Sequence, residues 1–543
     1  MKARNLALPL SEHGRVALAL FMLILLAAVA YASRPLTPID ETRYIGVAWE
    51  MWLRGDFLVP FKNGAPYSHK PPLMIWLYQA GWAIFGVNEW WPRLVHPLMA
   101  AGSLLLTFSL ARRLWPERAD IGGSAVLILV SSLLWTIFST SAMFDIILAF
   151  FTLIGMHGVL MAAEGRVKQG FFVLGVAIGL GVLTKGPVIL LHVLPAALLA
   201  PWWNRQQRCS HWFAGILIAV LIGAVIALAW ALPAGLAGGK AYQHAIFWGQ
   251  TADRMVESFA HRRPLWWYLP ILPALLFPWL VWPGLWSALG KFVRQDFDRG
   301  GRFCLAWLAP VVIAFSFISG KQPHYLIPVF PAFALLASRA LASAPRIRGL
   351  WLPTLVVLVI GGVLLAMATG VTSHAGLANR PLIGPSMLMV AMAAGCYLYG
   401  RRVTRPVLAM AMLGIVTSTL GQLTLVRPLY PAYDVGPLAR AIQAAQAGGH
   451  TVAHLGDYHD QYHFAGRLQA PLPVFDDGEK LKVWLIRHPD AYVVLYPKEI
   501  LRLEAIPVIA SQRYMDGAVA LLDAQSALSF LSLEPTRTSR QYR

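Results

Sequence analysis

The sequence carries little charge and almost no cysteine for its length. Only 13% of its 543 residues are Asp, Glu, Lys or Arg, whereas soluble domains carry roughly 25%. The three cysteines, Cys209, Cys304 and Cys396, all lie in or beside long apolar runs, so we expect no disulfide framework. Hydrophobic residues make up 57% of the chain. This composition excludes an ordinary soluble globular protein and predicts an integral membrane protein.

Acidic residues are especially scarce, with 26 Asp and Glu against 45 Lys and Arg and a formal net charge of +19. Such a charge could indicate a nucleic-acid partner. However, the basic residues gather in short loops between apolar runs, as in the cytoplasmic loops of membrane proteins. We therefore expect membrane lipids, and no nucleic acid, around this chain.

Two further absences narrow the function. No internal repeat is evident in the sequence, which counts against a transporter built from two similar halves. The segment T-K-G-P at Thr184–Pro187 lacks the glycine spacing of a nucleotide-binding loop. We interpret this segment, with Lys185, as a mainly structural turn.

The apolar runs predict a polytopic α-helical membrane protein. A membrane-spanning helix needs roughly 20 apolar residues, and thirteen runs qualify. They cover residues 14–32, 92–111, 121–140, 146–163, 170–184, 187–202, 213–232, 266–288, 303–319, 325–338, 349–370, 385–400 and 407–425. The first run ends in a sequence that could pass for a signal-peptidase site, but we expect it to be retained as a helix.

The basic residues indicate the orientation in the membrane, and a change in composition after Val426 indicates the domain division. With a cytoplasmic N-terminus, they fall mainly in cytoplasmic loops. We predict a membrane domain at 1–426, with periplasmic loops 33–91 and 233–265, and a small periplasmic α/β domain with a basic tail at 427–543. Within these regions, helices are expected at 45–53, 73–85, 436–447, 478–487 and 498–503, and strands at 451–454, 492–495 and 518–522.

The first outer loop concentrates polar groups in two motifs, T-P-I-D-E-T-R-Y at Thr37–Tyr44 and Y-S-H-K-P-P-L at Tyr67–Leu73. The carboxylate of Asp40 could accept a proton or bind a sugar; the alternative is a solvated loop at a helix end. Lys70 precedes two prolines, which favour extended backbone and present the lysine rigidly. Its ammonium could hold a phosphate, or it could be an ordinary interfacial lysine.

Other candidates lie in later outer segments. Asp145 stands among apolar residues at the outer end of a span, which indicates function unless it only caps the helix. Arg254 is our choice for a phosphate ligand among the cations of the second outer loop. Lys321 and Tyr325 share a proline-rich turn in which a structural and a site role are equally open. We interpret one histidine-rich group in the C-terminal domain as a polar surface loop without metal: His454, Asp457, His459, Asp460 and His463.

Taken together, the motifs resemble a known family. In chain order they are I-D-E-T-R-Y at 39–44, Y-x-x-K-P-P-L at 67–73, a lone aspartate at 145, L-T-K-G-P at 183–187 and K-x-P-x-Y-L-x-P at 321–328. This set resembles the polyprenyl-phosphate-dependent GT-C glycosyltransferases, and in particular the lipid A aminoarabinose transferases, which are related to the protein O-mannosyltransferases. The resemblance spans roughly residues 10–340, and the predicted spans and C-terminal domain match that layout.

The resemblance implies a reaction at the outer face of a bacterial inner membrane. An inverting glycosyltransferase of this kind moves a sugar from undecaprenyl phosphate to an envelope acceptor, lipid A being the leading candidate. By this resemblance, the catalytic residues are Asp40 and Asp145, the ligands of the carrier phosphate are Lys70 and Arg254, and the residues near the sugar or cavity are Glu41, Arg43, Tyr44, Tyr67, His69 and Tyr325.

The sequence departs from the family pattern at two positions. The aminoarabinose transferases usually have glutamate where this chain has His69, and histidine where it has Gln250. In the family those positions are associated with a metal, so we assign no metal ligand or certain cofactor here. A divalent metal, a protein or glycan acceptor, and a flippase of lipid-linked sugars remain alternatives. Ionisable groups near the outer ends of spans favour one-sided chemistry over transport.

Overall fold

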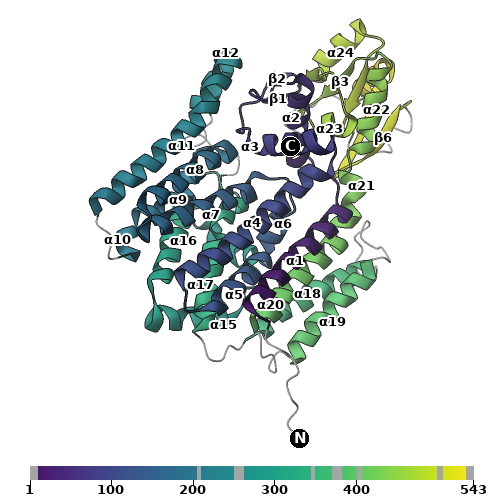
Figure 1. Ribbon diagram of the computed structural model, residues 1–543. Coiled ribbons are helices and arrows are strands. Elements are labelled where there is room, and N and C mark those ends of the chain that lie inside the picture. Colours follow the sequence, from purple (N-terminus) through teal and green to yellow (C-terminus); the bar gives the residue numbers. More distant parts are fainter. Residues whose placement is uncertain are drawn as a thin grey trace. The chain divides into compact units, whose positions relative to one another are not determined.

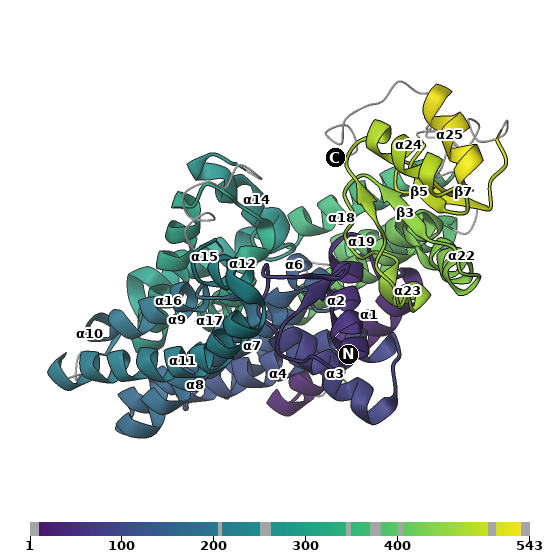
Figure 2. The same ribbon diagram turned by 90° about the horizontal axis from the view of Figure 1, so that it is seen from above.

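The computed structural model describes residues 10–204, 209–249, 262–343, 349–369, 382–399, 406–497 and 506–533. The chain forms two compact units, drawn in Figures 1 and 2. Unit 1 comprises Met1–Ala32, Arg93–Pro233 and His244–Leu425. Unit 2 comprises Ser33–Pro92, Ala234–Gln243 and Val426–Arg543. Unit 2 thus joins the first loop to the C-terminal part of the chain, whereas the sequence predicts a boundary only near residue 426.

Unit 1 is a bundle of apolar helices. Its principal helices are α1 (Glu12–Ser33), α4 (Trp90–Leu114), α5 (Ala119–Val130), α6 (Leu133–Phe138), α7 (Phe144–Ala163), α8 (Val167–Lys185), α9 (Ile189–Leu198), α10 (Ala200–Trp203), α11 (Cys209–Ala237), α14 (Tyr268–Leu275), α15 (Pro283–Lys291), α16 (Arg299–Phe317), α17 (Phe330–Ala342), α18 (Trp351–Ala368), α19 (Ile383–Tyr399) and α20 (Pro406–Gly421). Nine helices in the described ranges are long and apolar enough to cross a membrane. The chain is therefore a polytopic membrane protein, and the count of thirteen spans stays a prediction.

Helices α7 and α8 pack closely because two glycines face each other across their contact. A Cβ atom added to Gly158 would lie 2.7 Å from the carbonyl oxygen of Gly170. A Cβ on Gly170 would lie 2.3 Å from the backbone nitrogen of Ala162. Small residues let membrane helices approach to backbone contact, so this pair of helices can carry two polar side chains in a fixed relation at the end where α7 begins and α8 ends.

Two predicted spans are interrupted in the structure. The run 121–140 divides into α5 and α6 because the hydroxyls of Ser131 and Ser132 bond back to the carbonyls of Leu127 and Ile128 at 2.6 and 2.8 Å. The run 266–288 divides into α14 and α15 around a proline-rich segment, since proline cannot donate the helical hydrogen bond. Apolar composition alone does not reveal such breaks.

The C-terminal part of unit 2 is a three-layer α/β structure. Its sheet has the order β4-β3-β5-β7-β6, with β3 parallel to β4 and β5, and β7 antiparallel to β5 and β6. The strands are β3 (Val452–Leu455), β4 (Val474–Phe475), β5 (Tyr492–Leu495), β6 (Ala510–Tyr514) and β7 (Gly517–Asp523). The helices are α21 (Tyr430–Tyr433), α22 (Gly436–Ala447), α23 (His463–Gly466), α24 (Gly478–Arg487) and α25 (Ala524–Leu533).

Strand β7 shows why this sheet has helices on both faces. Its residues Val519 and Leu521 pack with α22, while Ala520 and Leu522 pack with α24 and α25. Successive strand residues point to opposite faces, so a strand that is apolar from Ala518 to Leu522 needs two apolar layers (Figure 2). The predicted strands at 451–454, 492–495 and 518–522 are present within a residue, and β4 and β6 were missed. The predicted helix at 498–503 lies outside the described residues.

The first loop contributes α2 (Asp40–Arg54), the short hairpin β1 (Phe61–Lys62) and β2 (Ala65–Pro66), and α3 (Leu73–Phe85). This loop packs against the C-terminal segment within unit 2. The indole of Trp49 donates to the carbonyl of Leu468 at 2.9 Å, and Trp82 stacks on Phe464 with ring centroids 5.4 Å apart. These two tryptophans are therefore buried against protein.

Candidate active site

The first turn of α2 gathers an acid, a cation and a phenol. Arg43 forms an ion pair with Oδ1 of Asp40, and the hydroxyl of Tyr44 lies 3.4 Å from the same oxygen. Half of the Asp40 side chain remains exposed. Burial, followed by the neighbouring carboxylate of Asp40, raises the pKa of Tyr44, so the phenol stays protonated as a donor. The carboxylate is therefore held at one oxygen and remains accessible.

Glu41, next to Asp40, is used differently. It is 4% exposed and forms an ion pair with Arg34. The backbone N–H of Thr37 donates to the same Glu41 oxygen at 2.8 Å. Arg34 also donates to the hydroxyl of Thr37 at 3.2 Å. This network fixes the chain entering α2, so Glu41 supports the position of Asp40, and sequence reasoning missed Arg34 as its partner.

The second motif of the loop follows the β1–β2 hairpin. Tyr67 is 5% exposed and its ring stacks on that of His69, with centroids 5.2 Å apart and planes inclined by 19°. The Tyr67 N–H donates to the carbonyl of Pro60 at 2.7 Å, which anchors the motif. Lys70 is half-buried immediately before the two prolines that precede α3. The segment therefore presents an aromatic pair and an ammonium on a constrained backbone.

Unit 1 contains its own acid and cation. Asp145 lies in the first turn of α7 and Lys185 is the last residue of α8, and Lys185 Nζ is 2.5 Å from Asp145 Oδ1. The Asp145 side chain is 1% exposed and that of Lys185 11%. The same ammonium lies 4.9 Å from the ring centroid of Tyr325. The sequence predicts Asp145 and Tyr325 as site residues but treats Lys185 as structural, and the structure places all three together.

The neighbouring proline-rich turn is held by backbone carbonyls. Lys321 is 3% exposed and donates to the carbonyls of Arg263 and Ile318 at 3.0 and 2.6 Å. These contacts give Lys321 a structural role. Of the structural and the site role that the sequence leaves open for this residue, they favour the structural one. Arg254, the predicted phosphate ligand of the second outer loop, and Gln250 lie outside the described residues.

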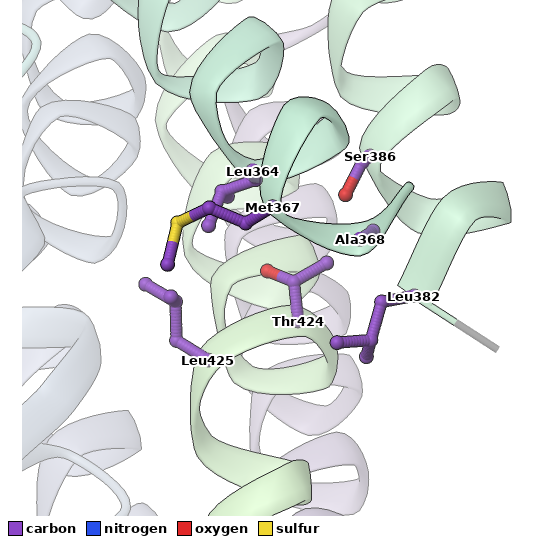
Figure 3. Close-up of a pocket in the computed structure, with 7 residues that line it drawn as sticks. All are labelled: Leu364, Met367, Ala368, Leu382, Ser386, Thr424 and Leu425. Carbon is purple, nitrogen blue, oxygen red and sulfur yellow. The ribbon is translucent and has the colours of Figure 1, made fainter. Parts of the chain in front are cut away.

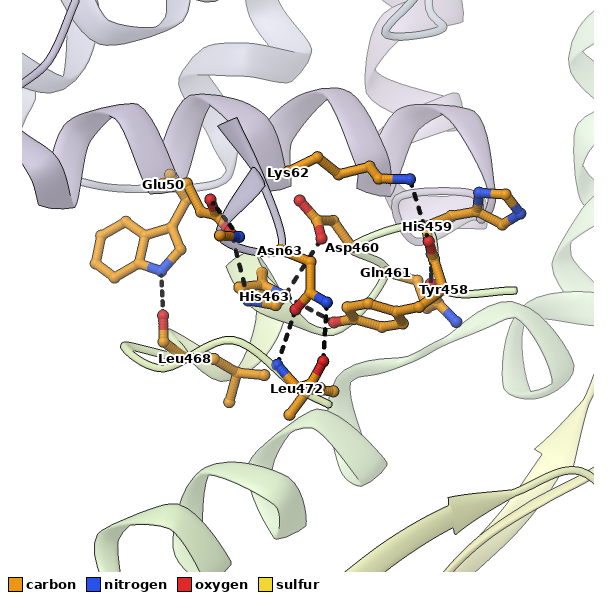
Figure 4. A network of polar contacts seen from close by, with 12 residues as sticks. Glu50, Lys62, Asn63, Tyr458, His459, Asp460, Gln461, His463, Leu468 and Leu472 are labelled. Carbon is orange, nitrogen blue, oxygen red and sulfur yellow. Dashed lines mark hydrogen bonds and ion pairs between the residues drawn. The ribbon is translucent and has the colours of Figure 1, made fainter. Parts of the chain in front are cut away.

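A buried polar group lies elsewhere in unit 2. Glu50 on α2 and Asp460 and His463 after β3 each offer a ligand atom, and these atoms lie within 4.8 Å of one another (Figure 4). Asp460 is fully buried and His463 is 2% exposed. Our interpretation of the histidine-rich segment as a polar surface loop is therefore wrong, because α2 and the first hairpin cover it. Burial, followed by the carboxylate of Glu50, raises the pKa of Asp460.

Lys62 and His459 are further polar residues that sequence reasoning did not place near Asp40. Lys62 Nζ donates to the carbonyl of Tyr458 at 3.3 Å. Burial, then the cations Arg43 and Lys62, lowers the pKa of His459, and Asp40 also acts on this imidazole in the opposite direction. No sequence signal could bring residue 459 next to residue 40, because the two are joined only by the fold.

The pocket drawn in Figure 3 is apolar and does not fit a phosphate or a sugar. It is lined by Leu364, Met367, Ala368, Leu382, Ser386, Thr424 and Leu425. The hydroxyl of Thr424 is already bonded to the carbonyl of Leu420 at 2.8 Å. With no charged residue in its lining, this pocket is not a candidate for catalysis.

Comparisons with known proteins point to glycosyl transfer. The family model described as dolichyl-phosphate-mannose-protein mannosyltransferase matches residues 69–230. A relative from Edwardsiella ictaluri is 33% identical over 379 residues, covering 67% of this chain and 66% of the relative. One from Enterobacter sp. is 28% identical over 384 residues, covering 68% of this chain and 67% of the relative. Both are named undecaprenyl phosphate-alpha-4-amino-4-deoxy-L-arabinose arabinosyl transferase.

The fold is similar to that of ArnT from Cupriavidus metallidurans. Its apo crystal structure gives a TM-score of 0.73 at 23% identity, covering 95% of this chain and 99% of that chain. The structure bound to undecaprenyl phosphate gives 0.70 at 22%, covering 93% and 97%. The chain is a GT-C glycosyltransferase that resembles ArnT. The predicted fold class and enzyme class are thereby confirmed, and the named relatives favour transfer over the flippase alternative.

At the two positions associated with a metal in ArnT-like enzymes, this chain has residues of other types. His69 stands in place of the usual glutamate and its ring stacks on Tyr67. Gln250, in place of the usual histidine, offers only an amide, a poor ligand for a transition metal. No catalytic step is therefore derived through a metal at this position.

Proposed function

We propose that the chain transfers a sugar from undecaprenyl phosphate to an envelope acceptor, with lipid A as the leading acceptor and inversion at the anomeric carbon. The observation that carries this proposal is the half-exposed carboxylate of Asp40, held by Arg43 and Tyr44, in a chain whose relatives are named arabinosyl transferases. Those relatives cover about two thirds of the chain, and the acceptor is assigned by similarity.

Asp40 is the proposed catalytic carboxylate. The ion pair with Arg43 fixes one of its oxygens. If the acceptor is a hydroxyl, Asp40 takes its proton as general base. If the acceptor is a phosphate of lipid A, it is already an anion near neutral pH, and Asp40 orients the reacting groups. Glu41 supports the backbone that carries Asp40.

The leaving group is a phosphate monoester, so negative charge develops on its oxygens as the glycosidic bond breaks. Preorganised cations at low dielectric stabilise such charge. Lys70, presented before two prolines, and Arg254 are the proposed ligands of the carrier phosphate. Arg43, Tyr44, Tyr67 and His69 are the proposed polar and aromatic contacts of the sugar.

For Asp145 we propose a positioning role, in place of the catalytic role that the resemblance implies. Because it is buried and bound by Lys185, it acts as a positioning residue for that ammonium. Lys185 in turn lies over the ring of Tyr325, which stabilises a cation in an apolar setting. We include Tyr325 as a proposed cavity contact.

We place the active site and the C-terminal domain on the periplasmic side of a bacterial inner membrane. The support is the asymmetric distribution of basic residues among the loops and the polyprenyl-phosphate donors in the names of the relatives. The domain boundary near residue 426 belongs to the same proposal.

The test is mass spectrometry of lipid A and of the polyprenyl-phosphate pool from cells that make the wild type, Asp40→Asn or Asp516→Asn. Asp516 is an exposed carboxylate in the β6–β7 turn and serves as the matched control. We expect one added pentose-sized sugar on lipid A with the wild type and Asp516→Asn, and none with Asp40→Asn.

Extracting lipid A and the polyprenyl-phosphate pool from the same cells tests the identity of the acceptor separately from the transfer reaction. Unchanged lipid A with a donor pool consumed only by active protein would retain the transferase and replace the acceptor by a protein or another glycan. Unchanged lipid A together with an unchanged donor pool, in cells that contain the donor, would contradict the proposed function.

A further inference from the structure

A second polar centre in unit 2 is built from residues far apart in the sequence. Glu50 lies on α2, and Asp460 and His463 lie between β3 and the end of α23. One ligand atom from each side chain lies within 4.8 Å of the others, and all three side chains are buried. Figure 4 shows the carboxylates and the imidazole directed toward a common point between the two segments.

The atoms that face this point lack the partners that burial requires. Both carboxylate oxygens of Asp460 and Nε2 of His463 are buried without a hydrogen bond of standard geometry to a described residue, and Asp460 Oδ1 lies 3.6 Å from His463 Nδ1. His463 Nε2 and Glu50 Oε1 are 3.6 Å apart, which is too long for a hydrogen bond. Two ligands on one tetrahedral zinc ion are about 3.3 Å apart, given bonds of about 2.0 Å. The spacing therefore fits two ligands of one ion better than a direct contact.

Two of the three side chains are oriented by a further hydrogen bond. His463 Nδ1 is 2.7 Å from the hydroxyl of Tyr458, as when a metal-bound imidazole donates its second N–H to an outer partner. The N–H of Gly64 lies 3.0 and 3.1 Å from the two oxygens of Glu50 and orients that carboxylate.

The backbone is shaped to bring the two segments together at this point. A Cβ atom on Gly46 would lie 2.9 Å from the Cβ of Asp460 and 3.0 Å from its carbonyl oxygen, so α2 passes against Asp460 only because residue 46 is glycine. Gly46 and Glu50 are one turn apart and share a helix face. Asp460 itself has φ of +60°, a conformation that aspartate tolerates better than most residues.

From this geometry we infer that Glu50, Asp460 and His463 bind a divalent transition-metal cation of the zinc class, which joins α2 to the segment after β3. Two carboxylates and an imidazole suit zinc or manganese, whereas calcium and magnesium favour oxygen ligands alone. The ion adds positive charge beside two buried carboxylates, of which Glu50 has only a long ion pair with Arg54, at 3.9 Å. A water molecule completes the coordination.

The ion has a structural role in α2. Glu50 lies ten residues after Asp40 on this helix, a rise of about 15 Å, so the metal does not touch the reacting groups. It fixes the helix whose first turn carries Asp40, Arg43 and Tyr44. The metal inference stands on the buried ligand atoms and does not depend on the proposed transferase activity.

The test measures metal in the full-length protein, purified in detergent with a tag that contains no histidine. The protein is loaded with zinc sulfate, desalted, and analysed by inductively coupled plasma mass spectrometry. We expect about one zinc per chain, and after removal by EDTA and reloading with cobalt, the visible absorption bands of a protein-bound Co²⁺ ion. Zinc-free protein should also have a lower Tm, because an ion that binds only the folded state stabilises it.

Variants separate the built site from adventitious binding. Asp460→Asn and His463→Gln should lose the zinc, and Tyr458→Phe should weaken its binding about tenfold or more, since it removes the outer partner of the histidine. Asp457→Asn and His459→Gln, neighbouring residues outside the three-ligand group, should retain it. Elution as a single folded species on size exclusion verifies each variant.

Two results would overturn the inference. Wild-type protein that carries no zinc or cobalt after loading would contradict the site directly, with no dependence on the folding of any variant. Equal metal content in the wild type, Asp460→Asn and His463→Gln would show an adventitious ion only. Activity measured in parallel distinguishes this failure from a failure of the proposed transferase function.

Discussion

Two carboxylates, each in the first turn of a helix and each paired with a cation, illustrate the difference between a reacting group and a positioning group. Asp40 begins α2 and pairs with Arg43, and half of its side chain is exposed. Asp145 lies at the start of α7 and pairs with Lys185, and its side chain is 1% exposed. Sequence alone ranks the two similarly, whereas the structure leaves only Asp40 open to a substrate.

This comparison predicts opposite effects of the same chemical change. Neutralising a buried ion-pair partner leaves an uncompensated charge away from water, whereas neutralising a half-exposed one costs little stability. Neutralising a group that acts on the substrate slows the reaction. The two positions can therefore be separated by measuring stability and activity on the same variants.

The largest effect on stability is expected for Asp145→Asn. The change leaves the ammonium of Lys185 buried without its counter-charge, which costs about 3–5 kcal/mol in such pairs. Thermal unfolding of the protein in detergent should show a clear fall in Tm. The double variant Asp145→Leu with Lys185→Met should recover part of the loss, because both charges are removed. A Tm equal to that of the wild type in the single variant would mean that the pair is not buried.

The complementary variant Asp40→Asn should lower Tm less than Asp145→Asn does and should reduce transfer. Loss of a positioned acid–base group lowers the rate by about a hundredfold to ten-thousandfold, whereas the ion pair that is lost is half exposed at Asp40 and is therefore weakened by solvent. Activity with a radiolabelled donor and Tm should be measured on one preparation. A strong fall in Tm would instead place Asp40 with Asp145 as a supporting residue.

The contact between α2 and the C-terminal segment gives a third test. In Gly46→Ala, the added methyl group meets the backbone of Asp460 at about 3 Å, and overpacking of this kind costs about 1–3 kcal/mol. The matched control is Gly290→Ala on α15, where nothing lies within 4 Å of the new Cβ. Thermal unfolding should show destabilisation only in the first variant; equal Tm values would mean that α2 can move away without cost.

The sequence predicts the local parts of this molecule well and the long-range contacts poorly. The helix at 436–447 and the strand at 492–495 follow from short-range patterns and appear at the expected residues. The motif at Asp40–Tyr44 forms its own ion pair because its members are one helical turn apart. Local spacing of three or four residues is visible in a sequence.

By contrast, the pairing of Glu50 with Asp460 and His463 had no sequence signal. The histidine-rich segment has the composition of an exposed loop, and only the cover provided by α2 and the first hairpin buries it. Likewise, Asp145 and Lys185 belong to different helices, and it is the glycine contact between α7 and α8 that brings those helices close. Tertiary packing, which composition does not encode locally, decides both cases.

A pH-dependent effect on stability is expected from a buried histidine of the sheet. His454 is fully buried, its Nε2 is 2.9 Å from the hydroxyl of Tyr496, and burial lowers its pKa to about 3. The unfolded chain, with an ordinary pKa near 6.5, therefore binds more protons, so stability is complete above that pH and falls between pH 6.5 and 3. At pH 5 the loss is about 2 kcal/mol.

Hydrogen exchange of β3 peptides at pH 7 and pH 5 measures this loss of stability. His454→Gln should remove much of the difference and His488→Gln, on the surface, none; an unchanged difference in His454→Gln would assign the effect to another group.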